Sequence, residues 1–313
     1  MKYKILVTGC GGDIGQSIGK ILNESPDVEA LYGCDISDEN AGIFIFKNFM
    51  LGPSCKAENY LDQLKKKVQD NNINLLIPIA EPELRFYAEN GINDTLAGAK
   101  LVIASAKALE IGFDKLKTAN FLQLNGLPFP ITKPVSEIIM PDNFPVILKS
   151  RTGSGSAKVF VVNDADEFNF LKKKHPEFIV QEFLQGENGE YTCGLFRSSA
   201  GEIRTIILKR KLTGGFSGYG EVIENDEINN LLLEIAKKID LTGSINVQLR
   251  LTPKGPVVFE INPRFSSTVL FRHMFGFTDV LWSIEDKAGV PLSAYTAKPA
   301  GRKFYKGFNE YIS

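Results

Sequence analysis

The chain has 313 residues, a mass of 34.6 kDa, and 36 basic against 37 acidic side chains, which gives a formal charge of −1. This balance provides no general field for nucleic acid or an anionic membrane, so neither is expected as a partner. Apolar runs such as residues 75–80 are too short to span a bilayer, and the first residues do not resemble a secretory signal. Four widely spaced cysteines favour reduced thiols in the cytoplasm, and two histidines argue against a histidine-rich metal site.

The first hundred residues alternate strand-like and helix-like segments. Strands are predicted at residues 4–8, 30–34, 75–79 and 101–104, and helices at 15–23, 60–69 and 83–89. Strands separated by helices imply a parallel sheet that is covered on both faces. We therefore expect a doubly wound α/β module that ends near residues 105–114.

The rest of the chain is rich in strands after a helix predicted at residues 113–125. Strands are predicted at 145–149, 157–162, 178–181, 190–197, 203–211, 244–251 and 257–261, with helices at 165–174 and 226–239. Antiparallel hairpins with helices on one side form an α+β arrangement. The predicted fold class is thus α/β followed by α+β.

A glycine-rich turn at residues 8–15 follows the first strand, and Asp35 ends the next one. This spacing is typical of a dinucleotide site, in which glycines approach the pyrophosphate and the acidic residue holds the ribose. The chain has no Tyr-x-x-x-Lys pair, so the proton donor of the reductases that share the Thr-Gly-x-x-Gly turn is missing. The alternative is a tight strand–helix turn that needs small residues for packing.

A hairpin predicted near the end of the chain carries candidate metal ligands. If its turn is centred on Lys254, Gln248 lies opposite Glu260, and Asn262 lies on the same face. Carboxylate and amide oxygens suit Mg²⁺, and Pro263 would direct Arg264 toward the metal. The opposite, core-facing side is predicted to carry Val257, Phe259 and Ile261. The alternative is the solvated polar face of an edge hairpin.

A second glycine cluster lies between two predicted strands and consists of Gly153, Ser154, Gly155 and Ser156. Because it does not open a helix, it is not a Walker loop. It instead predicts a flap whose backbone N–H groups cover phosphates, with Lys149 at the end of the preceding strand as a point charge for phosphate oxygens. The alternative is a mobile hairpin tip.

Other candidate residues lie around a predicted hinge near residues 182–186. Extended backbone there can face a flat base, Glu182 could accept an exocyclic amine, and Glu190 could hold ribose hydroxyls. Further along, the basic run Lys209-Arg210-Lys211 precedes a glycine-rich segment that contains Ser217, which predicts a lid for an anionic substrate. Each of these side chains could instead be an ordinary surface residue.

Taken together, these motifs resemble the ATP-grasp superfamily, in the branch of the carbamoyl-phosphate synthase large subunit, with one copy where those synthases have two. The most specific pieces are Asn-Val-Gln at 246–248 and Glu-Ile-Asn-Pro-Arg at 260–264. The resemblance implies a Rossmann-like pre-ATP-grasp domain at residues 1–108 and a two-lobed ATP-grasp domain at 109–313. Its nucleotide lobe would span about 109–185, and its metal and substrate lobe about 186–313.

The resemblance also implies a role for each candidate residue. ATP would be bound by Lys115, Lys117, Lys149, Gly153, Ser154, Gly155, Ser156, Glu182, Phe183, Leu184 and Glu190. Two Mg²⁺ ions, for which Mn²⁺ is expected to substitute, would be held by Gln248, Glu260 and Asn262. Arg264 and Lys149 would be catalytic, and the substrate would be contacted by Lys209, Arg210, Lys211 and Ser217.

The implied activity is that of an ATP-dependent carboxylate–amine ligase, which forms an acyl phosphate and releases ADP and phosphate. Carbamoyl phosphate is not the expected product, because a histidine expected near residues 213–220 is missing. The expected partners are a small carboxylate and an amine, and a homodimer is left open. The alternatives are a nicotinamide-dependent oxidoreductase that uses the N-terminal turn and a non-catalytic ATP-binding protein.

Overall fold

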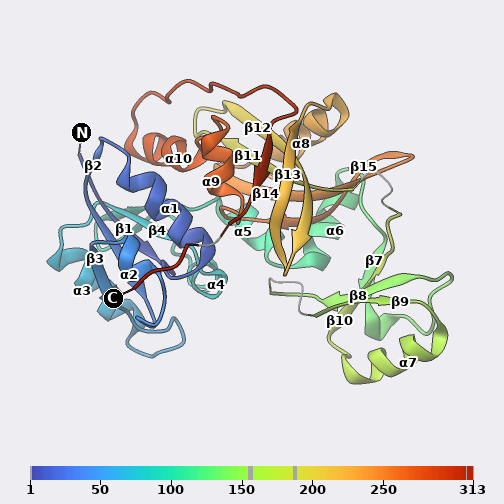
Figure 1. The fold of residues 1–313 in the computed structure, drawn as a ribbon. Coiled ribbons are helices and arrows are strands. Elements are labelled where there is room, and N and C mark those ends of the chain that lie inside the picture. The colour runs from blue at the N-terminus through green and yellow to red at the C-terminus, as the bar shows by residue number, and fades with distance from the viewer. Residues whose placement is uncertain (1, 154–157, 186–188, 308, 313) are drawn as a thin grey trace.

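The fold is described from a computed structural model that covers residues 2–153, 158–185, 189–307 and 309–312, with the backbone alone at Phe216. The predictions for Ser154, Gly155 and Ser156 therefore lie outside the described residues. Three sheets organise this part of the chain (Figure 1). Within it, no helix combines the length and hydropathy that a membrane crossing requires.

The first sheet has the strand order β3-β2-β1-β4-β6-β5, and its pairs are parallel except that of β5 with β6. Its strands are β1 (Tyr3–Thr8), β2 (Val28–Asp35), β3 (Asn48–Leu51), β4 (Leu75–Pro78), β5 (Thr95–Leu96) and β6 (Ala99–Leu101). Its helices are α1 (Asp13–Asn23), α2 (Gly42–Ile45), α3 (Tyr60–Asp70), α4 (Glu81–Glu89) and α5 (Ala106–Gly112). Along β1, Leu6 joins one core while Ile5 and Val7 join another, as expected of a sheet covered on both faces. The predicted doubly wound α/β architecture is confirmed.

The second sheet is small and antiparallel, with the order β7-β10-β8-β9. It consists of β7 (Thr132–Pro134), β8 (Val146–Ser150), β9 (Val159–Val162) and β10 (Phe178–Glu182), next to a 3₁₀ turn at Val135–Glu137 and α7 (Ala165–Lys174). Phe168 and Leu171 of α7 pack on Leu148 and Val180 of the sheet. This unit projects to the lower right in Figure 1.

The third sheet has the order β15-β14-β11-β12-β13-β16. Its strands are β11 (Glu190–Arg197), β12 (Ile203–Thr213), β13 (Phe216–Ile223), β14 (Gly243–Thr252), β15 (Gly255–Asn262) and β16 (Lys303–Tyr305). The accompanying helices are α6 (Lys115–Leu124), α8 (Asp226–Lys238), α9 (Val269–Met274) and α10 (Asp279–Ala288). One hydrophobic cluster joins this sheet, α6 and α8 to the first sheet, so the two packed units share a core.

The β14–β15 hairpin pairs Gln248 with Glu260 and Asn246 with Asn262, as the predicted register requires. The turn, however, joins Thr252 to Gly255, one residue away from the predicted symmetry, and a bulge between Gln248 and Leu249 restores the register. The prediction for the core face is therefore wrong in part. Val258 and Ile261 are fully buried, whereas the bulge leaves Val257 and Phe259 half-buried outside this core.

Asp114 links the first turn of α6 to the loop after β8. Its carboxylate accepts hydrogen bonds from the backbone N–H groups of Leu116 and Lys117 and from Arg151 Nε, at distances of 2.9–3.2 Å. Burial raises the pKa of this carboxyl, but the Arg151 and backbone hydrogen bonds outweigh burial and lower it overall. The carboxylate thus stabilises the entry to the helix.

We expect Asp114→Ala to lower the free energy of unfolding by about 1–2 kcal/mol, because a helix cap and an ion pair are both lost. Asp114→Asn keeps the cap and should cost less than about 1 kcal/mol. Since the folded pKa is depressed, the Asp114→Ala deficit should persist at neutral pH and shrink as the pH falls below about 4. Urea unfolding at two pH values measures this, and equal losses for the two variants would contradict it.

Candidate functional site

A cavity of about 1070 Å³ lies where the three sheets meet. Its lining includes Thr8 and Asp35 from the first sheet, Lys149 from the second, and Gln248 and Glu260 from the third. The cavity is therefore continuous from the α/β module to the antiparallel sheets. Most of the candidate residues predicted from the sequence can be placed relative to it.

Lys149 lies on β8, and only 5% of it is exposed. Its ammonium donates to Gln181 Oε1 at 2.8 Å, and it lies 5.6 Å from the centre of the Phe259 ring. Burial lowers the pKa of Lys149 to about 8, Glu260 opposes this shift, and Lys115 adds to it. A buried cation of this kind is stabilised by an anionic ligand in the cavity.

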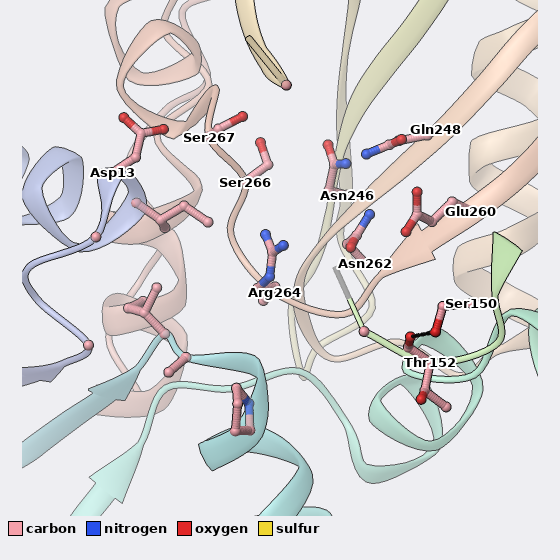
Figure 2. Close-up of a pocket in the computed structure, with 18 of the residues that line it drawn as sticks. Asp13, Ser150, Thr152, Asn246, Gln248, Glu260, Asn262, Arg264, Ser266 and Ser267 are labelled. Carbon is pink, nitrogen blue, oxygen red and sulfur yellow. Dashed lines mark hydrogen bonds between the residues drawn. The ribbon is translucent and has the colours of Figure 1, made fainter. Parts of the chain in front are cut away.

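Gln248, Glu260 and Asn262 are directed into the same part of the cavity (Figure 2). No hydrogen bond with another described residue engages their side-chain oxygens, and the ion partner of Glu260 is Lys115 at 3.6 Å. One carboxylate and two amides, all oxygen donors, fit a hard cation that keeps some of its ligands from water or phosphate. No group of three or more His, Cys, Asp or Glu side chains in the described ranges could replace this set.

Arg264 follows Asn262 after the end of β15 and points into the cavity beside it (Figure 2). Its Nη1 donates to the Phe265 carbonyl at 2.8 Å, and burial lowers the pKa of its guanidinium although Glu81 and Glu260 favour the charged form. The Pro263 bend thus places a second, half-buried cation near the oxygen ligands.

The two candidate lysines of α6, Lys115 and Lys117, point in different directions. Lys115 lines the cavity and donates to the Gly153 carbonyl at 2.7 Å, so it links the start of α6 to the entry of the glycine-rich segment. Lys117 lies on the exposed side of the helix, where its ammonium pairs with Glu110 at 2.8 Å. The helical phase explains this difference, because residues two positions apart point in different directions.

The hinge residues Glu182, Phe183 and Leu184 line the cavity. The carboxylate of Glu182 accepts from the Ile131 N–H at 3.1 Å, and the Leu184 carbonyl accepts from Arg250 Nη1 at 3.0 Å. The Glu182 carboxylate therefore already accepts a hydrogen bond from the backbone. The sequence analysis predicted an exocyclic amine as its donor and did not predict this one.

Glu190 also lines the cavity, between two arginines. Its Oε1 accepts from Arg210 Nε and Nη2 at 3.1 and 2.5 Å, and its Oε2 lies 3.8 Å from Arg250 Nη2. Register pairing of Glu190 with both Arg210 and Arg250 across neighbouring strands creates this arrangement.

The basic run does not precede a loop as predicted, because Ile203–Thr213 and Phe216–Ile223 form the β12–β13 hairpin. Strand alternation splits the run: Arg210 lines the cavity, while Lys209 and Lys211 are exposed and are not among the lining residues. Ser217 is buried and accepts from Arg210 Nη1 at 3.1 Å, so it supports Arg210 and does not line the cavity.

The N-terminal glycine-rich turn borders the other end of the cavity. Asp35 Oδ2 accepts from the Gly11 N–H at 2.7 Å, and its Oδ1 accepts from the Ile36 N–H at 2.8 Å. A Cβ atom at Gly15 would lie 2.5 Å from the Gly9 carbonyl oxygen. The Asp35 carboxylate thus holds the turn, and close packing alone already requires a glycine at position 15.

Several cavity residues were not identified from the sequence. Phe259 reaches the cavity because of the bulge, Asn246 belongs to the Asn-Val-Gln motif but was given no role, and Tyr60, Ser266 and Ser267 had no motif. Alternation along residues 245–251 already places Asn246 beside Gln248, so that signal was present in the sequence.

Two antiparallel sheets thus border a cavity that contains a buried lysine and a set of oxygen ligands. Residues 113–268 match the family model of the ATP-grasp domain, and this part of the chain is therefore an ATP-grasp domain. The predicted resemblance to the superfamily is confirmed, while the branch within it stays a prediction.

Curated relatives support the same family. The chain is 26% identical over 234 residues to a D-alanine–D-alanine ligase from Mycobacterium sp. (strain KMS), with 62% of each chain covered. The corresponding ligase from Mycolicibacterium smegmatis is 27% identical over 229 residues. The match spans less than two thirds of these relatives' length.

Solved structures show the same fold over nearly the whole chain. N5-carboxyaminoimidazole ribonucleotide synthetase from Thermus thermophilus superposes with a TM-score of 0.74 at 17% identity, covering 95% of this chain and 81% of that one. L-amino acid ligase from Bacillus licheniformis gives a TM-score of 0.69 at 17% identity, covering 92% and 75%.

We expect Mg·ATP to bind more weakly as the pH rises above about 8, because Lys149 then loses the charge that attracts phosphate. The dissociation constant should rise up to about tenfold per pH unit until another contact dominates. Lys149→Arg keeps its charge throughout this range, so its affinity should be nearly independent of pH. Calorimetric titrations between pH 7 and 10 measure this, and the same slope in both proteins would contradict the role of Lys149.

Proposed function

We propose that the protein is an ATP-dependent ligase that joins a carboxylate to an amine through an acyl phosphate. The observation that carries the proposal is that Lys149, Arg264 and the Gln248–Glu260 pair line one continuous cavity. The matched ATP-grasp domain, together with relatives named as ligases, supports the same class of reaction.

The central physical problem of this reaction is the repulsion between a carboxylate and a polyphosphate. Lys115, Lys149 and Arg264 place three cations around the cavity; Lys149 is buried, and the other two are half-buried. Charges fixed in such surroundings act more strongly than in bulk solvent. Bound Mg²⁺, held by Gln248, Glu260 and Asn262, would supply further charge neutralisation.

In the first step a carboxylate oxygen attacks the γ-phosphorus of ATP, and the bond from this phosphorus to the bridging oxygen breaks. ADP leaves with that electron pair, and an acyl phosphate remains. In the second step the amine nitrogen attacks the acyl carbon, the carbon–oxygen bond to phosphate breaks, and the nitrogen loses a proton. The enzyme's part is chiefly to orient the reactants and stabilise developing charge.

We place the amine in the part of the cavity that enters the α/β module. There Glu83 is 4% exposed and accepts hydrogen bonds from Thr8 Oγ1 at 2.5 Å and from the Tyr60 hydroxyl. Burial raises the pKa of this carboxyl, although the hydroxyl donors oppose the shift. Within the described residues Glu83 forms no ion pair, so a substrate ammonium would favour its ionised form.

The finer features of the proposal are carried over from the sequence analysis. They are membership of the carbamoyl-phosphate-synthase-like branch, two Mg²⁺ ions with Mn²⁺ as a substitute, ADP and phosphate as products, a homodimer and a cytoplasmic location. We also propose that ATP lies with its base near Glu182–Leu184, its ribose near Glu190 and its phosphates near Lys149 and the segment that begins at Gly153.

The proposal predicts that a panel of small carboxylates with Mg·ATP and hydroxylamine yields ADP and a hydroxamate. Hydroxylamine is a small nucleophile that captures an acyl phosphate without the natural amine. Glu260→Gln should lower kcat at least about 100-fold, because it removes the one carboxylate of the metal set. Glu110→Gln, at the exposed partner of Lys117, is the matched control and should retain wild-type turnover.

Three outcomes would redirect the assignment. Wild-type turnover by Glu260→Gln would remove the metal role of Glu260. ATP binding without ADP release on any carboxylate would favour a non-catalytic ATP-binding protein. Saturable NADH binding without ATP binding, measured by fluorescence, would favour an oxidoreductase.

A further inference from the structure

Asn246 is a buried residue at the cavity wall, and hydrogen bonds from two neighbouring side chains fix the orientation of its amide. It lies on β14 two residues before Gln248 and is 2% exposed. Its Oδ1 accepts one hydrogen bond from Thr192 Oγ1 at 2.8 Å and a second from Arg272 Nη2. Because a guanidinium can only donate, the atom that faces Arg272 must be the amide oxygen.

The Asn246 amide nitrogen is consequently turned away from Arg272. No described residue accepts a hydrogen bond from this nitrogen. The nitrogen is also absent from the set of unpartnered side-chain atoms that are fully buried, so it retains some exposure. Asn246 lines the cavity beside Gln248, Asn262 and Arg264 (Figure 2). An unused donor at the wall of a cavity implies an acceptor on the ligand.

Arg272 itself is completely buried on α9 and does not line the cavity. Asp279 Oδ2 lies 3.9 Å from its Nη1, and Ser244 Oγ donates to the same carboxylate oxygen at 2.6 Å. Two of its nitrogens, Nε and Nη1, have no hydrogen-bond partner in the described ranges. Keeping such a charge out of water is costly, so the contact with Asn246 calls for a functional explanation.

We propose that Asn246 donates its amide N–H to an oxygen of the transferred phosphoryl group, and that Arg272 is a positioning residue that holds the amide in this orientation. The inference rests on the proposed function. Arg272 polarises the Asn246 carbonyl from behind, and Thr192 fixes the rotation of the same group. Burial lowers the pKa of Arg272 to about 10, so it remains a charged donor at neutral pH.

The phosphoryl group is the acceptor that the geometry favours. Asn246 is paired across the strands with Asn262, and it shares its cavity wall with Arg264 and Gln248, which are the residues assigned to metal and phosphate. A contact to the γ-phosphoryl group predicts a selective effect: binding of ATP analogues depends on Asn246, whereas binding of ADP does not.

The test compares the full-length protein's affinities for Mg·ADP and for Mg·AMPPNP, an ATP analogue with a γ-phosphoryl group that is not transferred. Asn246→Ala should weaken AMPPNP binding roughly 10- to 100-fold and change ADP binding less than about twofold. Arg272→Lys should cause a smaller loss of the same selective kind. In the double variant Arg272→Lys should add nothing to Asn246→Ala, since its effect passes through that amide.

Arg204→Lys is the matched control. Arg204 is 9% exposed, stacks on Trp282 of α10 and is not among the residues that line the cavity. Its replacement should lower the Tm without changing the ratio of the two affinities. If Arg272→Lys does not fold, Thr192→Val removes the other donor without changing side-chain shape and should show the same selectivity.

The outcomes separate the inference from the proposed function. If the wild-type protein binds neither nucleotide, the proposed function fails. If it binds both, and Asn246→Ala leaves the AMPPNP affinity unchanged, the inference is overturned while the function stands. If Arg272→Lys weakens both nucleotides equally, or adds its full effect to that of Asn246→Ala, Arg272 has only a structural role.

Discussion

The antiparallel pairing of β14 with β15 is the constraint on which the site depends. It sets Gln248 opposite Glu260 and Asn246 opposite Asn262, so four polar side chains come to one cavity wall. A one-residue slip would send these side chains to the other face. The bulge beside Gln248 preserves the register despite the displaced turn and also releases Phe259 from the core, which places an aromatic ring near Lys149.

Around this wall the protein holds positive charge in surroundings that disfavour it. Burial lowers the pKa values of Lys149, Arg264 and Arg272, and nearby carboxylates offset this effect only in part. The free-energy cost of burying a cation is offset where an anionic ligand binds beside it. The three cations differ in access, because Lys149 and Arg264 line the cavity whereas Arg272 acts through Asn246. We thus assign neutralisation of the ligand's charge to Lys149 and Arg264, and orientation of the Asn246 amide to Arg272.

The sequence was sufficient where chemistry and periodicity coincide. Alternation placed Gln248, Glu260 and Asn262 on one face, and the strand–helix order predicted the α/β sheet. The Gln248–Glu260 pair was predicted from a turn centred on Lys254, and it forms because the bulge compensates for the displaced turn. It was insufficient where a side chain's direction depends on tertiary context. Lys117 differs from Lys115 only by helical phase, and the segment after the basic run, which was predicted to be a loop, pairs with β12 as strand β13. Arg272 had no motif, because its partners Asn246 on β14 and Asp279 on α10 are brought to it only by tertiary packing.

The continuous cavity imposes an order on the proposed reaction. An acyl phosphate that forms near Arg264 is vulnerable to water, so the amine must already be close when phosphoryl transfer occurs. Glu83 and its hydroxyl donors Thr8 and Tyr60 line the same cavity. At the border of the cavity, Lys306 forms an ion pair with Asp13, which connects the segment after β16 to the α/β module. Because the first and third sheets also share a hydrophobic core, this end of the cavity is built into the packed body of the protein. The small sheet that carries Lys149 packs around a separate hydrophobic core, so the proposed nucleotide and amine ends of the cavity belong to different packed units.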